Sequence, residues 1–178
     1  MAKYKEISML FVGVIGENKD YRLLNKRIKK EISNFKEKLE LIDIDDKSID
    51  NLKNVKFDTI VILSFPNKLK NKVYEIRKIL ESCKYLIINA DIDINKTLIE
   101  ELQFDILTFG LNQKSTITAS SIGDNNMIVC LQRNIKNVYQ ELIEPNEFNI
   151  KFDENIDNNV YNCLAYFSIL LLYNTIQD

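Results

Sequence analysis

The stretch "DTIVILSFPNKLKNKVYEIRKILESCKYLIINAD", residues 58–91, decides the fold. Its two ends are continuous apolar runs of strand length. Between them, Leu69, Val73, Ile76 and Leu80 recur three or four positions apart, which is the spacing of one helix face. Fully apolar strands joined by an amphipathic helix are typical of a parallel sheet that helices cover on both faces. The stretch therefore predicts strand, helix and strand within a doubly wound α/β domain.

The same alternation extends toward the amino terminus. "ISMLFVGVI" reads as a buried strand, the segment after it has apolar residues at helical spacing, and "LELIDID" reads as a short alternating strand. Downstream of residue 91 we expect a short helix over residues 97–102. Residues 1–104 are thus predicted to form the α/β part of the chain.

From residue 105 the pattern changes to short strands joined by Gly, Asn, Asp and Pro turns: "ILTFGL", "STITASSI", "MIVCLQR", "VYQELI" and "FNIKF". We expect a small antiparallel sheet or meander over residues 105–155, and a closing helix over residues 156–178. The fold class predicted for residues 1–178, taken as one domain, is α/β. It has a doubly wound, mostly parallel sheet, a small antiparallel sheet in the second half and a C-terminal core helix.

The closing helix, within "NNVYNCLAYFSILLLYNTI", is apolar enough to raise the question of a membrane span. A span needs about 20 apolar residues, and this segment is shorter, contains Asn162, Ser168 and Asn174, and lacks flanking Lys or Arg. A buried core helix is favoured, and an exposed face that pairs with a partner or a second copy is the next possibility.

The composition of the 178 residues narrows the function. The net charge is -2, so no strong field attracts nucleic acid or an anionic membrane. The basic segment 19–38 has Tyr21 and Phe35 near its ends but no aromatics interleaved among Lys26, Arg27, Lys29 and Lys30, which favours a solvated helix face over a nucleic-acid site. Histidine is absent, so the commonest general base and zinc ligand is missing. We expect a cytoplasmic protein whose cysteines are reduced core thiols: Cys83, Cys130 and Cys163.

The stretch "FVGVIGENKDY", residues 11–21, joins the first strand to the first helix. A phosphate-binding loop needs several glycines, a Lys, and a Ser or Thr for Mg²⁺. Here Gly13 lies within the strand, Gly16 begins the turn, and Lys19 is followed by Asp20. These residues alone favour a plain strand-to-helix turn over a phosphate loop.

Three runs together resemble, in order and spacing, the ATP-binding central domain of the Mur ligase family: "YLIINADID", "ILTFGLNQKSTITASSI" and "NNVYNCLAYFSILLL". Enzymes of that family join an amino acid to a carboxylate through an acyl phosphate. The resemblance spans most of the chain and implies a shortened relative that lacks the family's amino-terminal and carboxy-terminal domains.

The resemblance also assigns candidate site residues. It implies that Gly16, Asn18 and Lys19 are remnants of the family's phosphate loop, with Asp20 where the Mg²⁺-binding hydroxyl should stand. This change predicts that tight triphosphate binding is lost, because a carboxylate there repels phosphate.

Two further matches concern adenine and metal. Asn159 and Asn162 are similar to the family's asparagines beside adenine, and an amide can read the edge of adenine because it offers a donor and an acceptor. Tyr74 and Lys78 match a Tyr and a carbamylated Lys that helps to hold Mg²⁺. The alternatives are ordinary residues at a helix start and a solvated lysine.

These expectations lead to a non-catalytic Mur-ligase-like protein with a binding or regulatory role in bacterial cell-envelope synthesis or division. No catalytic residue is assigned. ATP or ADP with Mg²⁺ is the possible cofactor, and a protein partner or a homodimer is expected. The alternatives are an ATP-dependent amide ligase subunit completed by a partner chain, and a nucleotide sensor without turnover.

Overall fold

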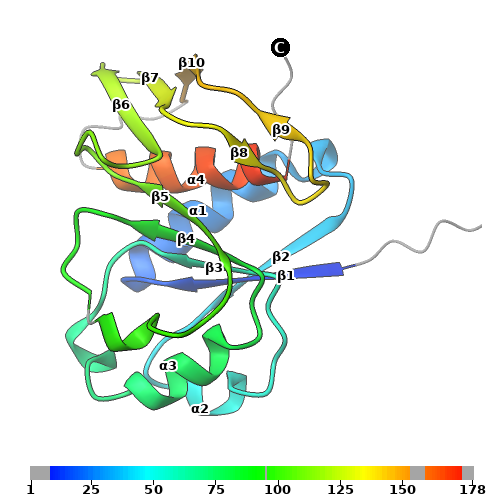
Figure 1. The fold of residues 1–178 in the computed structure, drawn as a ribbon, viewed down its shortest axis with the longest axis vertical. Helices are drawn as coiled ribbons and strands as arrows, with labels where there is room; N and C mark the ends of the chain where they lie inside the picture. The colour runs from blue at the N-terminus through cyan, green and yellow to red at the C-terminus, as the bar shows by residue number, and fades with distance from the viewer. Residues whose placement is uncertain (1–8, 95, 153–158, 174–178) are drawn as a thin grey trace, which may run out of the picture.

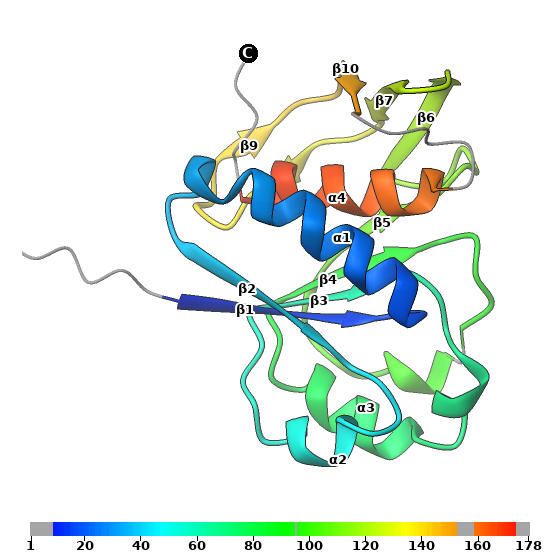
Figure 2. The ribbon, with the colours of Figure 1, turned by 180° about the vertical axis from the view of Figure 1, so that it is seen from behind.

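A computed structural model describes residues 9–94, 96–152 and 159–173, and in it a curved sheet separates two groups of helices (Figures 1 and 2). Two short helices cover one face, and two longer helices cover the other. Short 3₁₀ turns lie at Ile32–Asn34, Asn67–Leu69 and Lys96–Leu98. The helices are α1 (Asn18–Lys30), α2 (Ile49–Leu52), α3 (Val73–Leu80) and α4 (Val160–Leu172).

The main sheet has eight strands in the order β10-β7-β6-β5-β4-β3-β1-β2. Pairing is parallel from β2 through to β6, and β6, β7 and β10 pair antiparallel. A separate antiparallel pair is formed by β8 and β9. The strands are β1 (Met9–Ile15), β2 (Lys38–Asp43), β3 (Thr59–Ile62), β4 (Tyr85–Asn89), β5 (Asp105–Phe109), β6 (Ile117–Ile122), β7 (Asn126–Leu131), β8 (Ile135–Lys136), β9 (Leu142–Ile143) and β10 (Asn146–Lys151).

The predicted fold class is confirmed: the chain is α/β, with a mostly parallel sheet, a small antiparallel pair and a C-terminal helix. The chain runs from β1 outward to β2, then crosses back to β3 on the other side of β1. This reversal creates a switch point between β1 and β3. In such sheets, ligands bind beyond the carboxyl ends of the strands at this point.

The continuous apolar runs of the sequence are explained by two cores, one on each face of the sheet. In β1, Val12 and Val14 belong to the core beneath α1 and α4, whereas Ile15 belongs to the core beneath α2 and α3. Alternate residues of a strand point to opposite faces. A strand that is buried on both faces therefore needs apolar residues at every position.

α4 lies inside the first core rather than on its surface. Every residue from Asn162 to Leu172 is buried. α4 packs against α1 and β4 to β6, and in Figure 1 the strands beyond β5 curl over its other side. The rings of Phe148 in β10 and Phe167 lie 5.0 Å apart between centroids. The prediction of a core helix is confirmed, and α4 does not present the apolar face that we considered for a partner. Across the described ranges, no helix has the length and apolar character that crossing a membrane requires.

The second half of the chain differs in detail from its prediction. β5 pairs in parallel with β4, and the antiparallel strands β6, β7 and β10 continue the main sheet, so that only β8 and β9 of the described strands form a separate antiparallel pair. The expected strand "VYQELI" is reduced to β9, because Asn137 bends the chain just before it. Asn137 Oδ1 accepts hydrogen bonds from the backbone N–H groups of Tyr139 at 2.9 Å and Glu141 at 3.0 Å. This side chain replaces the ladder bonds that a longer strand would make.

No disulfide joins Cys83, Cys130 and Cys163. Cys83 and Cys163 are buried as expected, but Cys130 is partly exposed. Cys130 lies in β7, opposite Glu147 of the edge strand β10, and its thiol donates to Glu147 Oε1 at 3.4 Å. Cys130 lies between the buried residues Val129 and Leu131, and neighbouring residues of a strand point to opposite faces, so its side chain points away from the core.

Candidate functional site

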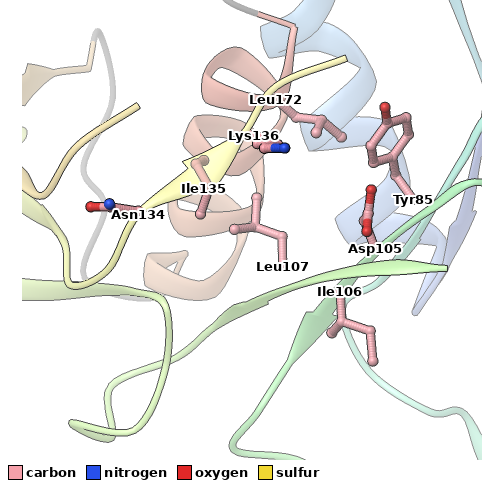
Figure 3. Close-up of a pocket in the computed structure, with 8 residues that line it drawn as sticks. All are labelled: Tyr85, Asp105, Ile106, Leu107, Asn134, Ile135, Lys136 and Leu172. Atoms are coloured by element: carbon pink, nitrogen blue, oxygen red, sulfur yellow. The ribbon is translucent and has the colours of Figure 1, made fainter. Parts of the chain in front are cut away.

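Among the hollows beyond the carboxyl ends of the parallel strands, two are lined by residues that the sequence predicted as a site. One, the asparagine hollow, has a volume of about 320 Å³ and is bounded by the ends of β3 and β4 and the starts of α1 and α4. The other, the switch hollow, has about 490 Å³ and lies beside the loops after β1, β2 and β3. A smaller cavity of about 220 Å³ lies at the opposite edge of the sheet, where β4 and β5 begin (Figure 3). The polar residues of the asparagine hollow are Asp20, Ser64, Asn89, Asp91, Asn159, Tyr161 and Asn162.

Asn162 joins the two long helices at the asparagine hollow. Its Oδ1 accepts a hydrogen bond from Arg27 Nη1 at 2.7 Å, and its Nδ2 donates to the backbone carbonyl of Asp20 at 2.7 Å. Asn162 and Arg27 are only 3% and 5% exposed. One N–H of the amide remains after these bonds. Asn162 is therefore first a link between α1 and α4, with little capacity left for a ligand.

Asn159 has more capacity. Asn159 precedes α4, and its side chain makes no capping hydrogen bond. The side-chain amide also has no hydrogen-bond partner in the part of the chain that the structure describes. Ser64 Oγ, at the end of β3, is also buried without a hydrogen-bond partner among these residues. A buried polar group without a partner costs free energy. This cost applies to Ser64 Oγ, whereas the Asn159 side chain is only partly buried and can bond to water. Both side chains line the asparagine hollow and have hydrogen-bonding groups that no described residue uses.

Asp91 has the opposite character, because its carboxylate is already engaged. It accepts hydrogen bonds from Leu111 N at 2.5 Å, from Asn112 Nδ2 and from the Tyr161 hydroxyl. Burial acts to raise the pKa of Asp91, but these bonds outweigh it and lower the pKa below the ordinary carboxyl value. Asp91 stays ionised and anchors the loop after β5 to the start of α4.

Asn89 shapes the floor of the same hollow. Its Nδ2 donates to the carbonyl of Leu63 at 3.0 Å, and its Oδ1 accepts from Asp91 N at 3.0 Å. Asn89 therefore holds the ends of β3 and β4 together. Ser64 and Tyr161 were not identified from the sequence, because only the fold brings the end of β3 to the start of α4.

The start of α1 is acidic where a phosphate loop would be basic. Glu17 occupies the position before the helix, and Asp20 lies in the first turn. Burial raises the pKa of Asp20, and the Glu17 carboxylate acts in the same direction, while Lys19 opposes them. Lys19 itself is exposed and is not among the residues that line either hollow. A helix start favours anions only when side chains leave it free.

Gly16 and Asn18 line the switch hollow, in positions with structural roles. A Cβ on Gly16 would lie 3.3 Å from Leu63 Cβ, so glycine lets the loop after β1 pack closely on the end of β3. Asn18 Nδ2 donates to Asp43 Oδ2 at 2.7 Å and joins α1 to the end of β2. Burial raises the pKa of Asp43, although the Asn18 bond opposes it.

The predicted metal ligand, Lys78, is not close to these residues. It lies in the last turn of α3, which runs antiparallel to the strands, so it is near their amino ends. Its Nζ donates to Glu81 Oε2 at 2.9 Å. Tyr74 is 68% exposed. The structure thus brings Asn159 and Asn162 together in the asparagine hollow. Gly16 and Asn18 line the switch hollow, and Lys19 and Lys78 line neither hollow.

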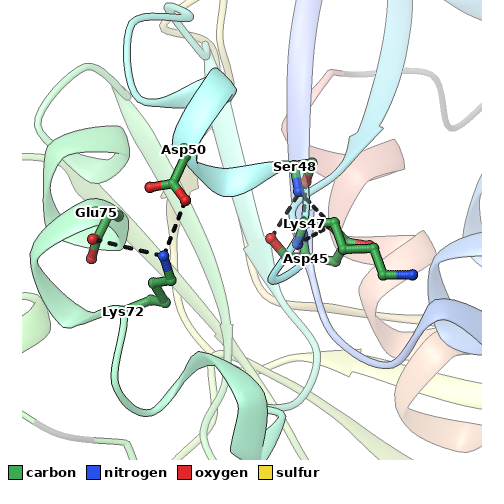
Figure 4. A network of polar contacts seen from close by, with 6 residues as sticks. All are labelled: Asp45, Lys47, Ser48, Asp50, Lys72 and Glu75. Carbon is green, nitrogen blue, oxygen red and sulfur yellow. Dashed lines mark hydrogen bonds and ion pairs between the residues drawn. The ribbon is translucent and has the colours of Figure 1, made fainter.

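Acidic side chains near the switch hollow bind parts of the protein instead of a cation (Figure 4). Asp45 Oδ1 accepts the N–H groups of Lys47 at 3.0 Å and Ser48 at 2.7 Å, which fixes the turn before α2. Asp50 accepts from Lys72 Nζ at 3.1 Å and so joins α2 to the start of α3. Over residues 9–94, 96–152 and 159–173, no three His, Cys, Asp or Glu side chains are grouped as a metal site.

A comparison with models of known protein families finds no match, and a comparison with curated protein sequences finds none either. The resemblance to the Mur ligase central domain therefore stays a prediction.

Proposed function

We propose that this chain is a non-catalytic binding protein whose asparagine hollow holds an uncharged, hydrogen-bonding small molecule of the nucleoside class. One observation carries the proposal: Asn159 and Ser64 line the same hollow, and neither side chain has a hydrogen-bond partner among the described residues. An amide that offers one acceptor and two donors can pair with the edge of a nucleobase. The apolar side chains of Leu63 and Ile92, which also line the hollow, suit the face of such a ring.

The charges of the hollow favour a nucleoside over a nucleotide. Asp20 and Asp91 are the charged residues of its lining, and Glu17 lies at the adjoining start of α1. Two like unit charges about 8 Å apart near a protein surface repel by about 2 kcal/mol. A triphosphate would meet this repulsion more than once, and none of the described residues that line the hollow is a lysine or arginine that could offset it.

The positions of the lysines support a role without phosphoryl chemistry. Activation of a carboxylate as an acyl phosphate needs positive charge beside the phosphates. Lys19 is exposed outside the hollow, and Lys78 pairs with Glu81 at the other edge of the sheet. The wider role, a binding or regulatory protein of bacterial cell-envelope synthesis or division that acts with a partner or a second copy, rests on the family resemblance.

Thermal unfolding with added ligands tests the proposal. A ligand that binds only the folded protein adds about 2.7 kcal/mol of stability at a hundredfold excess over Kd. We expect adenosine, or another nucleoside of a four-member panel, to raise the Tm more than ATP does, with or without Mg²⁺. The variant Asn159→Ala should lose this shift. Asn149→Ala, on the exposed edge strand β10, should keep it.

Two results would overturn the proposal. One is the absence of a shift with every nucleoside. The other is release of phosphate from Mg²⁺-ATP, with peptidoglycan precursors present, at a rate that Lys19→Ala or Lys78→Ala abolishes. The second result would instead establish the ligase subunit.

A further inference from the structure

The cavity at the amino edge of the sheet shares no lining residue with the two hollows (Figure 3). It lies between the first residues of β4 and β5, the short strand β8 and the end of α4. Its volume is about 220 Å³, below the range of about 300–1,000 Å³ that holds drug-sized ligands and cofactors. A ligand of this cavity must be a small metabolite.

The inner part of the cavity is apolar. Leu107 and Leu172 are 6% and 3% exposed, and Ile135 covers them from β8. Leu107 shares a face of β5 with Asp105, because residues two apart on a strand point the same way. An apolar group can therefore enter beside Leu107 while a polar group of the same molecule stays next to Asp105.

Opposite charges stand on the two walls of this cavity. Asp105 begins β5 and lies beside Tyr85 in the strand register. Lys136 reaches from β8 toward Tyr85 in Figure 3. Neither the Asp105 carboxylate nor the Lys136 ammonium makes a hydrogen bond or an ion pair with any residue that the structure describes. The Tyr85 hydroxyl accepts a long bond of 3.5 Å from Gln140 Nε2 and can still donate.

We propose that this cavity binds a small zwitterion with a branched aliphatic body, of the size of valine, leucine or isoleucine. The ligand carboxylate pairs with Lys136, and its ammonium pairs with Asp105. The ammonium also lies toward the carboxyl end of α4, where the helix dipole favours positive charge. The aliphatic branch packs on Leu107 and Leu172. This site is separate from the asparagine hollow, so it does not depend on the function proposed above.

A zwitterion fits better than a ligand with one charge. An aliphatic acid would neutralise Lys136 and leave its carboxylate near Asp105, and an aliphatic amine would place its ammonium near Lys136. Only a ligand that carries both charges satisfies both walls. Contacts with two charges and one apolar surface also fix three substituents of the ligand α-carbon, so the two enantiomers cannot bind equally.

Isothermal calorimetry on the full chain tests these contacts, with L-leucine, D-leucine, 4-methylpentanoate and 3-methylbutylamine as probes. We expect one leucine enantiomer to bind more tightly than the other, and to bind more tightly than either singly charged probe. Asp105→Asn and Lys136→Met should each weaken leucine binding by about 1.5-fold to fivefold, which is the range for exposed charge pairs. Asp124→Asn and Lys151→Met change exposed charges elsewhere and should leave binding unaltered.

Each variant should also remove the difference in affinity between leucine and one of the singly charged probes. Lys136→Met should bring the affinity for 3-methylbutylamine up to that for leucine, and Asp105→Asn should do the same for 4-methylpentanoate. Equal affinity for both enantiomers, no binding of leucine at millimolar concentration, or unchanged binding in both variants would each overturn the proposal. Asp105 and Lys136 are exposed, so we expect both variants to fold normally, and circular dichroism checks this.

Discussion

Asn162→Ala and Asn159→Ala remove two neighbouring asparagines from the same hollow, and we expect very different losses of stability. Asn162→Ala deletes the bond from Arg27, whose guanidinium is charged and buried, and the bond to the Asp20 carbonyl. A bond to a charged group contributes about 1.5–3 kcal/mol, and a neutral one about 0.5–1.5 kcal/mol. The two ranges together give about 2–4.5 kcal/mol. Because Arg27 keeps its contact with the ring of Phe152, whose centroid is 5.2 Å away, its charge stays partly compensated, and the expected cost lies in the lower part of the range, at about 2–3 kcal/mol.

Asn159→Ala is the matched control, because it removes the same amide from a side chain without partners among the described residues. Its cost should stay within about 0.5 kcal/mol. Urea unfolding followed by circular dichroism measures both values, and in a chain of this size the Asn162 variant should also lose about 4–12 °C in Tm. The structural role of Asn162 is refuted if its variant is as stable as the wild type, or if both variants lose the same amount.

Three other perturbations probe different parts of the fold. Burial raises the pKa of Asp20 in the folded state, so its ionisation opposes folding. Asp20→Asn should therefore raise stability at pH 7, and urea titrations should show this gain shrinking as the pH falls toward about 4 and absent below it. An unchanged gain at low pH would contradict the shift. Burial raises the pKa of the Cys83 thiol to about 12, and Cys163 is buried too. Iodoacetamide should therefore modify Cys130 first in the native protein, and Cys83 and Cys163 should react only in denaturant. Equal rates for all three, read by mass spectrometry, would argue against this packing. Phe167→Ala should lower the free energy of unfolding by about 3–5 kcal/mol, because the ring of this α4 residue is fully buried in the core. A loss below 1 kcal/mol on urea unfolding would show that α4 is not part of the core.

The parallel half of the fold could be predicted because its signals are local. β1, β3 and β4 are apolar along most of their length and β2 alternates, and the helical spacing at Ile76 and Leu80 needs no distant partner to be recognised. The burial of α4 was equally readable, because a helix that is apolar all round must be enclosed. The pairing of the later strands could not be predicted. The residues of Asn126–Leu131 alone do not indicate that this strand extends the main sheet and curls over α4.

The candidate site could be predicted only in part. Asn159 and Asn162 line one hollow, as expected of two asparagines near one ligand. Their roles differ, because Arg27 lies far away in sequence and occupies the Oδ1 of Asn162. Lys78 was assigned by spacing along a helix, and spacing does not tell at which edge of the sheet the helix ends. Ser64 carries no motif, and its importance comes from burial without a partner.

The bonds of Asn162 also determine how binding and stability are coupled at this edge of the sheet. Asn162 attaches the first turn of α4 to the Asp20 carbonyl in the first turn of α1, and Asn159 lies directly before α4. A ligand held by Asn159 and Ser64 would connect the start of α4 to the end of β3, which Asn89 already ties to β4. Such a ligand reinforces existing links between helix and sheet, so it needs no closing movement to stabilise the fold. Loss of Asn162 should then weaken ligand binding indirectly, by freeing α4, whereas loss of Asn159 should weaken binding without loosening the fold.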